Sequence, residues 1–245
     1  MSSQMLSKKK SVGIRSAIKG FDRKYGSLPV GELTVVSVPQ PEKTSHVMVE
    51  SQREIARSYV NKILLNALQN GLRVKYVFVG DLSKNRRAEF ELLQSQYQNQ
   101  FAFGTFQGKS MAVRIQQLTR LLTKLDVGKG TDLILVDGIE THSRKQLKES
   151  RGWVENCYMG MPTQLKYIAK ICKCPVLVVQ LETRSSKMRF DSAENLWFNN
   201  SEIVLTLMHR DGLCLVAPDG IIRRGIEAKL LKSPQGRSED DFWMV

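Results

Sequence analysis

The chain has 245 residues, of which 42% are hydrophobic, which is enough for a sizeable core and unlike the composition of disordered chains. No apolar run approaches the roughly 18 residues of a membrane-spanning helix, and the polar, basic N-terminus differs from a secretory signal. The formal net charge of +13 favours polyanionic partners, chiefly nucleic acid. Because lysine and arginine are spread along the chain, charge alone does not distinguish such a protein from an ordinary basic one.

The four cysteines predict free thiols rather than disulfides or a zinc site. Cys172 and Cys174 are separated by one lysine, which is too close for a zinc knuckle, and no second pair accompanies them. Free thiols are typical of a reducing compartment. We therefore expect a cytoplasmic protein without membrane contact.

The first half of the chain alternates between helical and extended patterns, after a flexible basic arm at residues 1–12. Helices are predicted from apolar residues at helical spacing and strands from compact β-branched runs. In chain order, the pattern predicts a helix within 13–26, a strand at 33–38, a helix at 49–69, a strand at 74–79, and helices at 84–98 and 111–125.

The second half continues this alternation and ends in adjacent strands. The pattern predicts a strand at 133–136, a helix at 163–172, and strands at 176–180, 203–208, 213–217 and 227–231. Such an order indicates an α/β fold with a mostly parallel twisted sheet, helices on both faces and an antiparallel edge. Without a repeat or linker, we expect one domain over 13–237, followed by an acidic-aromatic tail at 238–245.

Three segments, taken in order, carry a resemblance to a known family. The first is G-I-R-S-A-I-K-G-F-D-R-K-Y-G-S-L-P-V-G-E-L-T-V-V, which begins at Gly13. The second is T-D-L-I-L-V-D, which ends a predicted buried strand on Asp137. The third is Y-I-A-K-I-C-K-C-P-V-L-V-V-Q-L-E-T-R, in which Gln180 ends a strand. Together they resemble the RecA-like ring domain of the DnaB-family replicative DNA helicases, here without the family's N-terminal domain.

The resemblance implies a site for ATP and Mg²⁺ at a P-loop. Residues 37–44, S-V-P-Q-P-E-K-T, align with G-x-x-x-x-G-K-T, so that Lys43 matches the phosphate-binding lysine and Thr44 the Mg²⁺-binding hydroxyl. Serine and glutamate replace the two glycines, although a side chain there collides with phosphate. Two alternatives stay open. In the first, this segment is a loop before a helix that is extended at its N-terminal end. In the second, it is a surface loop, and residues 59–69 take the position of the family's helix.

The resemblance also implies roles for residues beyond the P-loop. Asp137 matches the aspartate that directs Mg²⁺, and Asp81 stands where the family carries its catalytic glutamate. The alternative for Asp81 is a residue near a helix N-cap. Gln180 matches a glutamine that senses the nucleotide, and Lys232 matches the lysine of a finger that reaches the neighbouring subunit's nucleotide.

Two further groups of residues suggest partners. Arg184, Lys187 and Arg189 precede F-D-S-A-E-N-L, which stands where the family carries its DNA-binding loop, and they predict contacts to the phosphates of single-stranded DNA. In the tail, three acidic residues precede Phe242 and Trp243. Such tails dock on replication proteins through the aromatic side chain. The alternative is a tail packed on its own domain.

Three functions are consistent with these observations. The first is a divergent DnaB-type helicase-like protein in DNA replication or recombination, which binds nucleic acid or a replication partner such as a true helicase with weak or no ATP hydrolysis. The second is an active ATP-dependent DNA helicase or translocase with an unusual P-loop. The third is a RecA-like recombination or strand-annealing mediator. A homo-oligomer is compatible with all three.

Overall fold

The structure is a computed structural model. It describes the following residues: 13–39, 46–80, 82–106, 130–140, 152–182, 196–216, 222–237 and 240–244.

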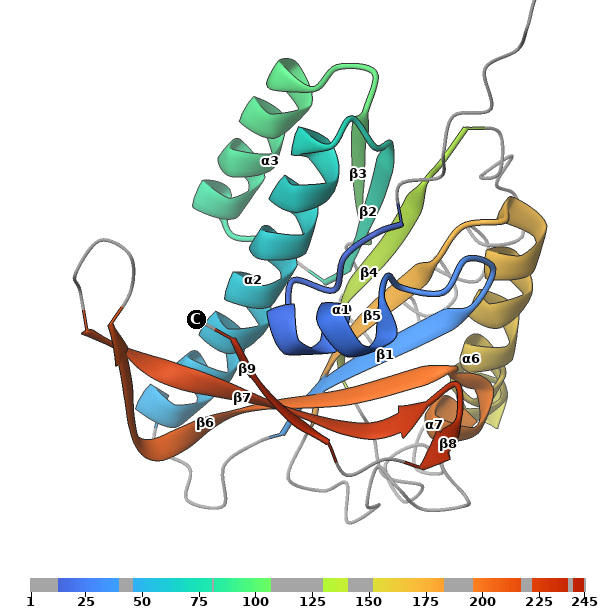
Figure 1. The fold of residues 1–245 in the computed structure, drawn as a ribbon. Helices are drawn as coiled ribbons and strands as arrows, with labels where there is room; N and C mark the ends of the chain where they lie inside the picture. The colour runs from blue at the N-terminus through green and yellow to red at the C-terminus, as the bar shows by residue number, and fades with distance from the viewer. Residues whose placement is uncertain are drawn as a thin grey trace, which may run out of the picture.

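A single mixed sheet forms the centre of the molecule (Figure 1). Its strands are β1 (Leu33–Val38), β2 (Val74–Val79), β3 (Phe101–Phe106), β4 (Leu133–Glu140), β5 (Val176–Leu181), β6 (Ile203–Val216), β7 (Ile222–Ser233), β8 (Gly236–Arg237) and β9 (Asp241–Met244). The order is β3-β2-β4-β5-β1-β6-β7-β8, and β9 also pairs with β7. Neighbours from β3 to β6 are parallel, whereas β7 pairs antiparallel with β6, β8 and β9. The predicted fold class is confirmed.

Helices cover both faces of the sheet. The described helices are α1 (Lys19–Tyr25), α2 (His46–Gln69), α3 (Lys84–Gln96), α6 (Gly152–Cys172) and α7 (Leu196–Asn200). Residues of α1, α2 and α3 share one buried cluster with one side of the sheet, and residues of α6 and α7 share a second cluster with the other side. Among the described helices, none combines the length and hydropathy needed to cross a bilayer.

The clearest difference from the predicted elements is the edge strand β3, which the sequence pattern missed. Its sequence F-A-F-G-T-F is short and contains a glycine, which weakens the sequence pattern that predicts a strand. Contacts with other elements stabilise the strand: it pairs with β2, and Phe101 and Phe103 pack on Phe90 of α3.

A second difference is that β6 is one long strand instead of the two predicted strands at 203–208 and 213–217. The predicted turn at 209–212 lies inside β6, where the pairing with β7 shifts register between His209 and Cys214. Turn-like residues are therefore accommodated as a bulge, because β7 offers pairing partners on both sides of it. The predicted helix at 111–125 and the arm at 1–12 lie outside the described residues.

The C-terminal segment belongs to the sheet. β9 pairs with β7, and the ring of Phe242 packs edge-on against Phe21 and Tyr25, with centroid distances of 5.9 and 6.4 Å. Asp240 accepts hydrogen bonds from the Lys24 ammonium, at 2.7 Å, and from the Tyr25 hydroxyl. The expectation of an exposed docking tail is therefore wrong for Phe242. The side chain of Trp243 lies outside the described residues.

Candidate functional site

The chain leaves the carboxyl ends of the central strands toward opposite faces of the sheet. After β1 it enters α2 on one face, and after β4 it enters α6 on the other. In open α/β sheets, ligands bind beyond the carboxyl ends of the strands, at such a change of direction. This edge is therefore where a site is expected, and the predicted residues Asp137 and Gln180 both lie on it.

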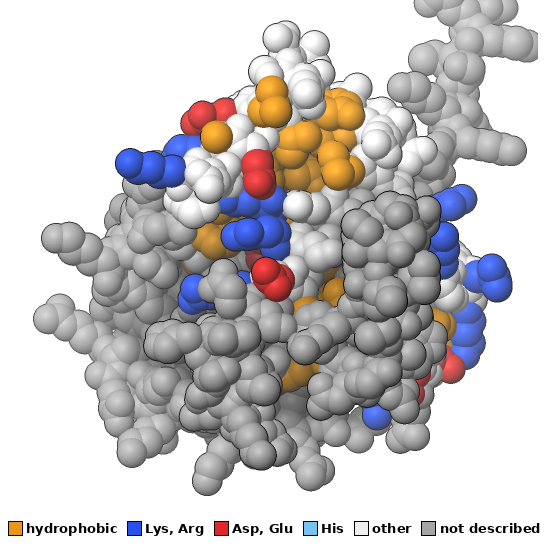
Figure 2. Space-filling model, turned by 90° about the vertical axis from the view of Figure 1, so that its left-hand side faces the viewer, with side chains coloured by type: hydrophobic (Ala, Val, Ile, Leu, Met, Phe, Trp, Pro, Cys, Tyr) orange, Lys and Arg blue, Asp and Glu red, His pale blue; other side chains and the backbone are white. Residues whose placement is uncertain are grey.

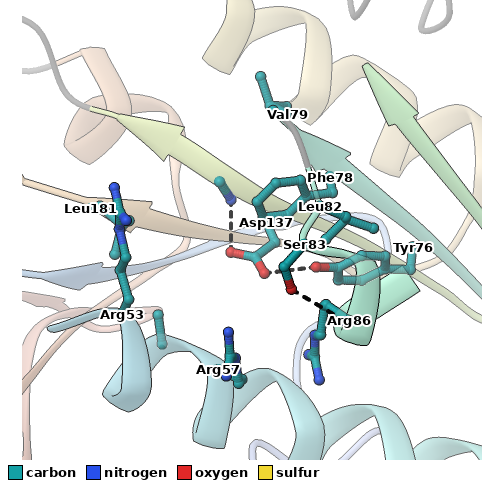
Figure 3. Close-up of a pocket in the computed structure, with 13 residues that line it drawn as sticks. Arg53, Arg57, Tyr76, Phe78, Val79, Leu82, Ser83, Arg86, Asp137 and Leu181 are labelled. Atoms are coloured by element: carbon teal, nitrogen blue, oxygen red, sulfur yellow. Dashed lines mark hydrogen bonds between the residues drawn. The ribbon is translucent and has the colours of Figure 1, made fainter. Parts of the chain in front are cut away.

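A pocket of about 440 Å³ opens at this edge on the α2 face (Figure 3). Its walls come from α2, the end of β2 with the turn into α3, and the ends of β4 and β5. The lining residues are Arg53, Ala56, Arg57, Tyr76, Phe78, Val79, Gly80, Leu82, Ser83, Arg86, Asp137, Gly138 and Leu181.

Asp137 lies at the base of this pocket because of a β-bulge in β4. Between Val136 and Ile139 the pairing with β5 shifts by one residue, and Gly138 there has φ of +79°. The Asp137 carboxylate accepts one hydrogen bond from the Tyr76 hydroxyl, at 2.8 Å, and one from the Gly138 N–H, at 2.7 Å. Burial raises the pKa of Asp137 above its usual value, against the opposing effect of these bonds.

Three arginines surround this carboxylate, and they differ in how they are held. Arg86 is buried, donates to Glu89 at 2.8 Å and to Asn61, and lies over the ring of Phe90. Arg53 and Arg57 extend from α2 toward the pocket (Figure 3) and are exposed. Within the described part of the chain, neither has a hydrogen bond or ion pair.

A different polar group lies at the carboxyl ends of β1 and β5. The hydroxyl of Ser37 donates to the carboxylate of Glu182, and burial raises the pKa of Glu182. The Gln52 amide on α2 donates to the carbonyls of Val38 and Glu182. Gln180 is fully buried, and its amide oxygen and nitrogen have no hydrogen-bond partner among the described residues.

These strand ends do not fit a P-loop. A P-loop leaves its strand at the first glycine so that backbone N–H groups can surround the phosphates. Here Ser37, at that glycine's position, stays in β1 and pairs with Gln180, and Val38 pairs with Leu181. The carboxylate of Glu182 beside Ser37 also repels phosphate. α2 begins at His46, two residues after Thr44, so the alternative with an N-terminally extended helix is the one observed.

The structure separates most of the predicted site residues. Asp137 faces the α2 side, whereas Gln180 lies on the same face of β5 as Val176 and Val178, which belong to the cluster on the α6 side. Lys232 pairs with Val204 near the start of β6, at the opposite edge, and its ammonium donates to the Phe198 carbonyl at 2.9 Å. The remaining predicted side chains lie outside the described residues: Lys43, Thr44, Asp81, Arg184, Lys187 and Arg189.

Sequence reasoning missed the residues that dominate the pocket. Arg53 and Arg57 are four residues apart on a predicted helix, which places them on one face, and this spacing was the available indication. Tyr76 reads as an ordinary strand residue, because its partner Asp137 is 61 positions away.

Comparison with known proteins rests on the fold. No family model matches the chain, and no curated protein matches its sequence. The crystal structure of the RadB recombinase matches with a TM-score of 0.58 and 20% sequence identity, covering 94% of each chain. This chain has a RecA-like fold. The finer resemblance to the DnaB family is not confirmed.

Proposed function

We propose that the protein is a RecA-like recombination or strand-annealing mediator that binds single-stranded DNA with weak or no ATP hydrolysis. The observation that carries this proposal is the fold likeness to a recombinase over 94% of both chains. Among the three functions left open by the sequence, a recombination role is the one that this likeness favours.

The electrostatics support the nucleic-acid part of the proposal. A net charge of +13 attracts a polyanion without regard to base sequence. Figure 2 shows the face that carries α2 and α3, where basic side chains lie in the middle of the view with acidic side chains beside them. Strand annealing requires only that two complementary strands be concentrated and partly neutralised, which such a surface can do without nucleotide turnover.

The site supports the proposal that ATP hydrolysis is weak or absent. β1 continues through the position of the first P-loop glycine, and Glu182 adds a carboxylate beside it. In addition, Tyr76 already donates to one oxygen of Asp137 and Gly138 to the other. Because these features oppose ATP binding, ATP-driven unwinding by a DnaB-type helicase is only the second candidate. ATP and Mg²⁺ would be cofactors in that second case alone.

The test is an annealing assay with two complementary oligonucleotides, run with and without ATP and Mg²⁺, beside an unwinding assay on a forked duplex. We expect faster annealing in both conditions, no unwinding, and no change on Lys43→Ala. ATP-dependent unwinding that Lys43→Ala abolishes would establish the helicase instead. Failure to accelerate annealing or to bind single strands would reject both functions.

A further inference from the structure

Arg53 and Arg57 place two exposed positive charges at the mouth of the pocket, where Arg57 interacts electrostatically with the buried Asp137. They lie one turn apart on α2, where like charges repel. Both are exposed, and neither is held by an acid or a carbonyl of the described chain. Two exposed guanidinium groups that make no hydrogen bond within the described chain have their donors available to a partner from outside the protein.

The remaining charged groups of the pocket do not supply that partner. Among the described lining residues, Asp137 is the single carboxylate, and both of its oxygens already accept hydrogen bonds. Arg86 adds a third guanidinium, whose orientation is fixed by Glu89, Asn61 and the ring of Phe90. The pocket therefore combines one fixed and two adjustable guanidinium groups.

We propose that this pocket binds a phosphate monoester carried on a nucleotide, with Arg53 and Arg57 as its phosphate ligands. Arginine presents a planar set of donors that matches phosphate oxygens in pairs. A volume of about 440 Å³ lies within the usual range of small-molecule sites and exceeds what one phosphate fills, so the phosphate is attached to a larger body.

The proposed site differs from a P-loop in both place and chemistry. It lies between α2 and the turn from β2 to α3, and its ligands are arginine side chains rather than the backbone N–H groups of the loop after β1. It does not rest on the proposed recombination function, because the phosphate can come from a free nucleotide or from the 5′ end of a DNA strand.

Calorimetric titration of the whole protein tests the site and separates these two sources. The probes are AMP, a 5′-phosphorylated single-stranded oligonucleotide, and the same oligonucleotide without the phosphate. We expect saturable binding of AMP, or tighter binding of the phosphorylated than of the unphosphorylated oligonucleotide. The first result assigns the phosphate to a free nucleotide and the second to a strand end.

Arg57→Gln is expected to weaken the phosphate-dependent binding about tenfold or more, since a bond between charged groups is lost. Arg23→Gln removes the same charge from an exposed position on α1, outside the pocket, and is the matched control. Because both arginines are exposed, both variants should melt like the wild type. The proposal is overturned if neither probe shows phosphate-dependent binding, or if Arg57→Gln and Arg23→Gln reduce it equally.

Discussion

Gly138 determines the shape of the pocket base, because no other residue fits its conformation and surroundings. Its φ of +79° lies in the left-handed region, and a Cβ there would lie 2.9 Å from the Phe78 ring and 3.0 Å from the Val79 carbonyl. This glycine lets β4 bulge, and the bulge places Asp137 within reach of Tyr76.

The substitution Gly138→Ala should therefore destabilise the fold by more than backbone strain alone. Gly71→Ala is the control, because Gly71 has φ of +76° but open space where a Cβ would lie. We expect a cost of about 1–2 kcal/mol for Gly71→Ala. For Gly138→Ala we expect roughly 1–3 kcal/mol more, from overpacking. Urea denaturation of both variants measures this, and equal costs would show that Phe78 and Val79 move aside freely.

Asp137 makes stability depend on pH. Its folded-state pKa is raised by burial, so the folded chain binds more protons than the unfolded chain between the two pKa values. Stability therefore falls as the pH rises from the usual aspartate value through the raised one, and the cost of the buried charge is fully present above that window.

The isosteric variant Asp137→Asn removes this charge. Relative to the wild type, we expect the variant to be more stable at pH 7 than at pH 4: its free energy of unfolding minus that of the wild type should be larger at pH 7. Asp241→Asn removes the same charge from an exposed position and controls for the change in net charge. Melting curves at the two pH values provide the comparison. A difference from the wild type that is the same at both would mean that the charge of Asp137 is not costly.

Among the elements, β9 shows how a short terminal segment becomes part of a fold. Its sequence, D-F-W-M, is short and lies near the chain end, where fraying is common. The strand pairs along one edge with β7, and the rings of Phe21 and Tyr25 pack on Phe242. The segment therefore joins the sheet to α1, two parts of the chain that are far apart in sequence.

Phe242→Ala should then destabilise the protein, whereas a free docking peptide would leave stability unchanged. A fully buried phenylalanine loses about 3–5 kcal/mol on truncation, so a half-buried one should lose roughly half of that. Asp241→Ala, on the same strand and exposed, should change stability by less than about 0.5 kcal/mol. Thermal melting of the two variants decides between these roles. Equal melting temperatures would restore the docking interpretation for Phe242.

At the scale of the whole molecule, the net charge of +13 governs association with nucleic acid. Binding that rests on neutralised phosphates releases counterions, and its affinity falls steeply with salt. We expect the affinity for single-stranded DNA to fall about tenfold or more between 50 and 200 mM salt, independently of base sequence. Fluorescence anisotropy with two unrelated oligonucleotides measures both properties. An affinity insensitive to salt would contradict an electrostatic interface.

The sequence by itself determined the main parallel core and the position of Asp137. Buried strands such as β1 and β5 are continuous β-branched runs, and helices such as α2 show their apolar face at regular spacing, so local periodicity is enough to identify them. The order of strands and helices then restricts the topology to a mostly parallel sheet.

Only the tertiary structure decided which of these residues act together. Asp137 meets Tyr76 across 61 positions, and Lys24 meets Asp240 across 216, and no local pattern specifies such contacts. The tertiary structure also decided the formation of β3, which depends on β2 and α3 for its stability. It likewise placed Asp137 and Gln180 on opposite faces of the sheet. Strand periodicity fixes the alternation of side chains, but packing against distant helices decides which face each one joins.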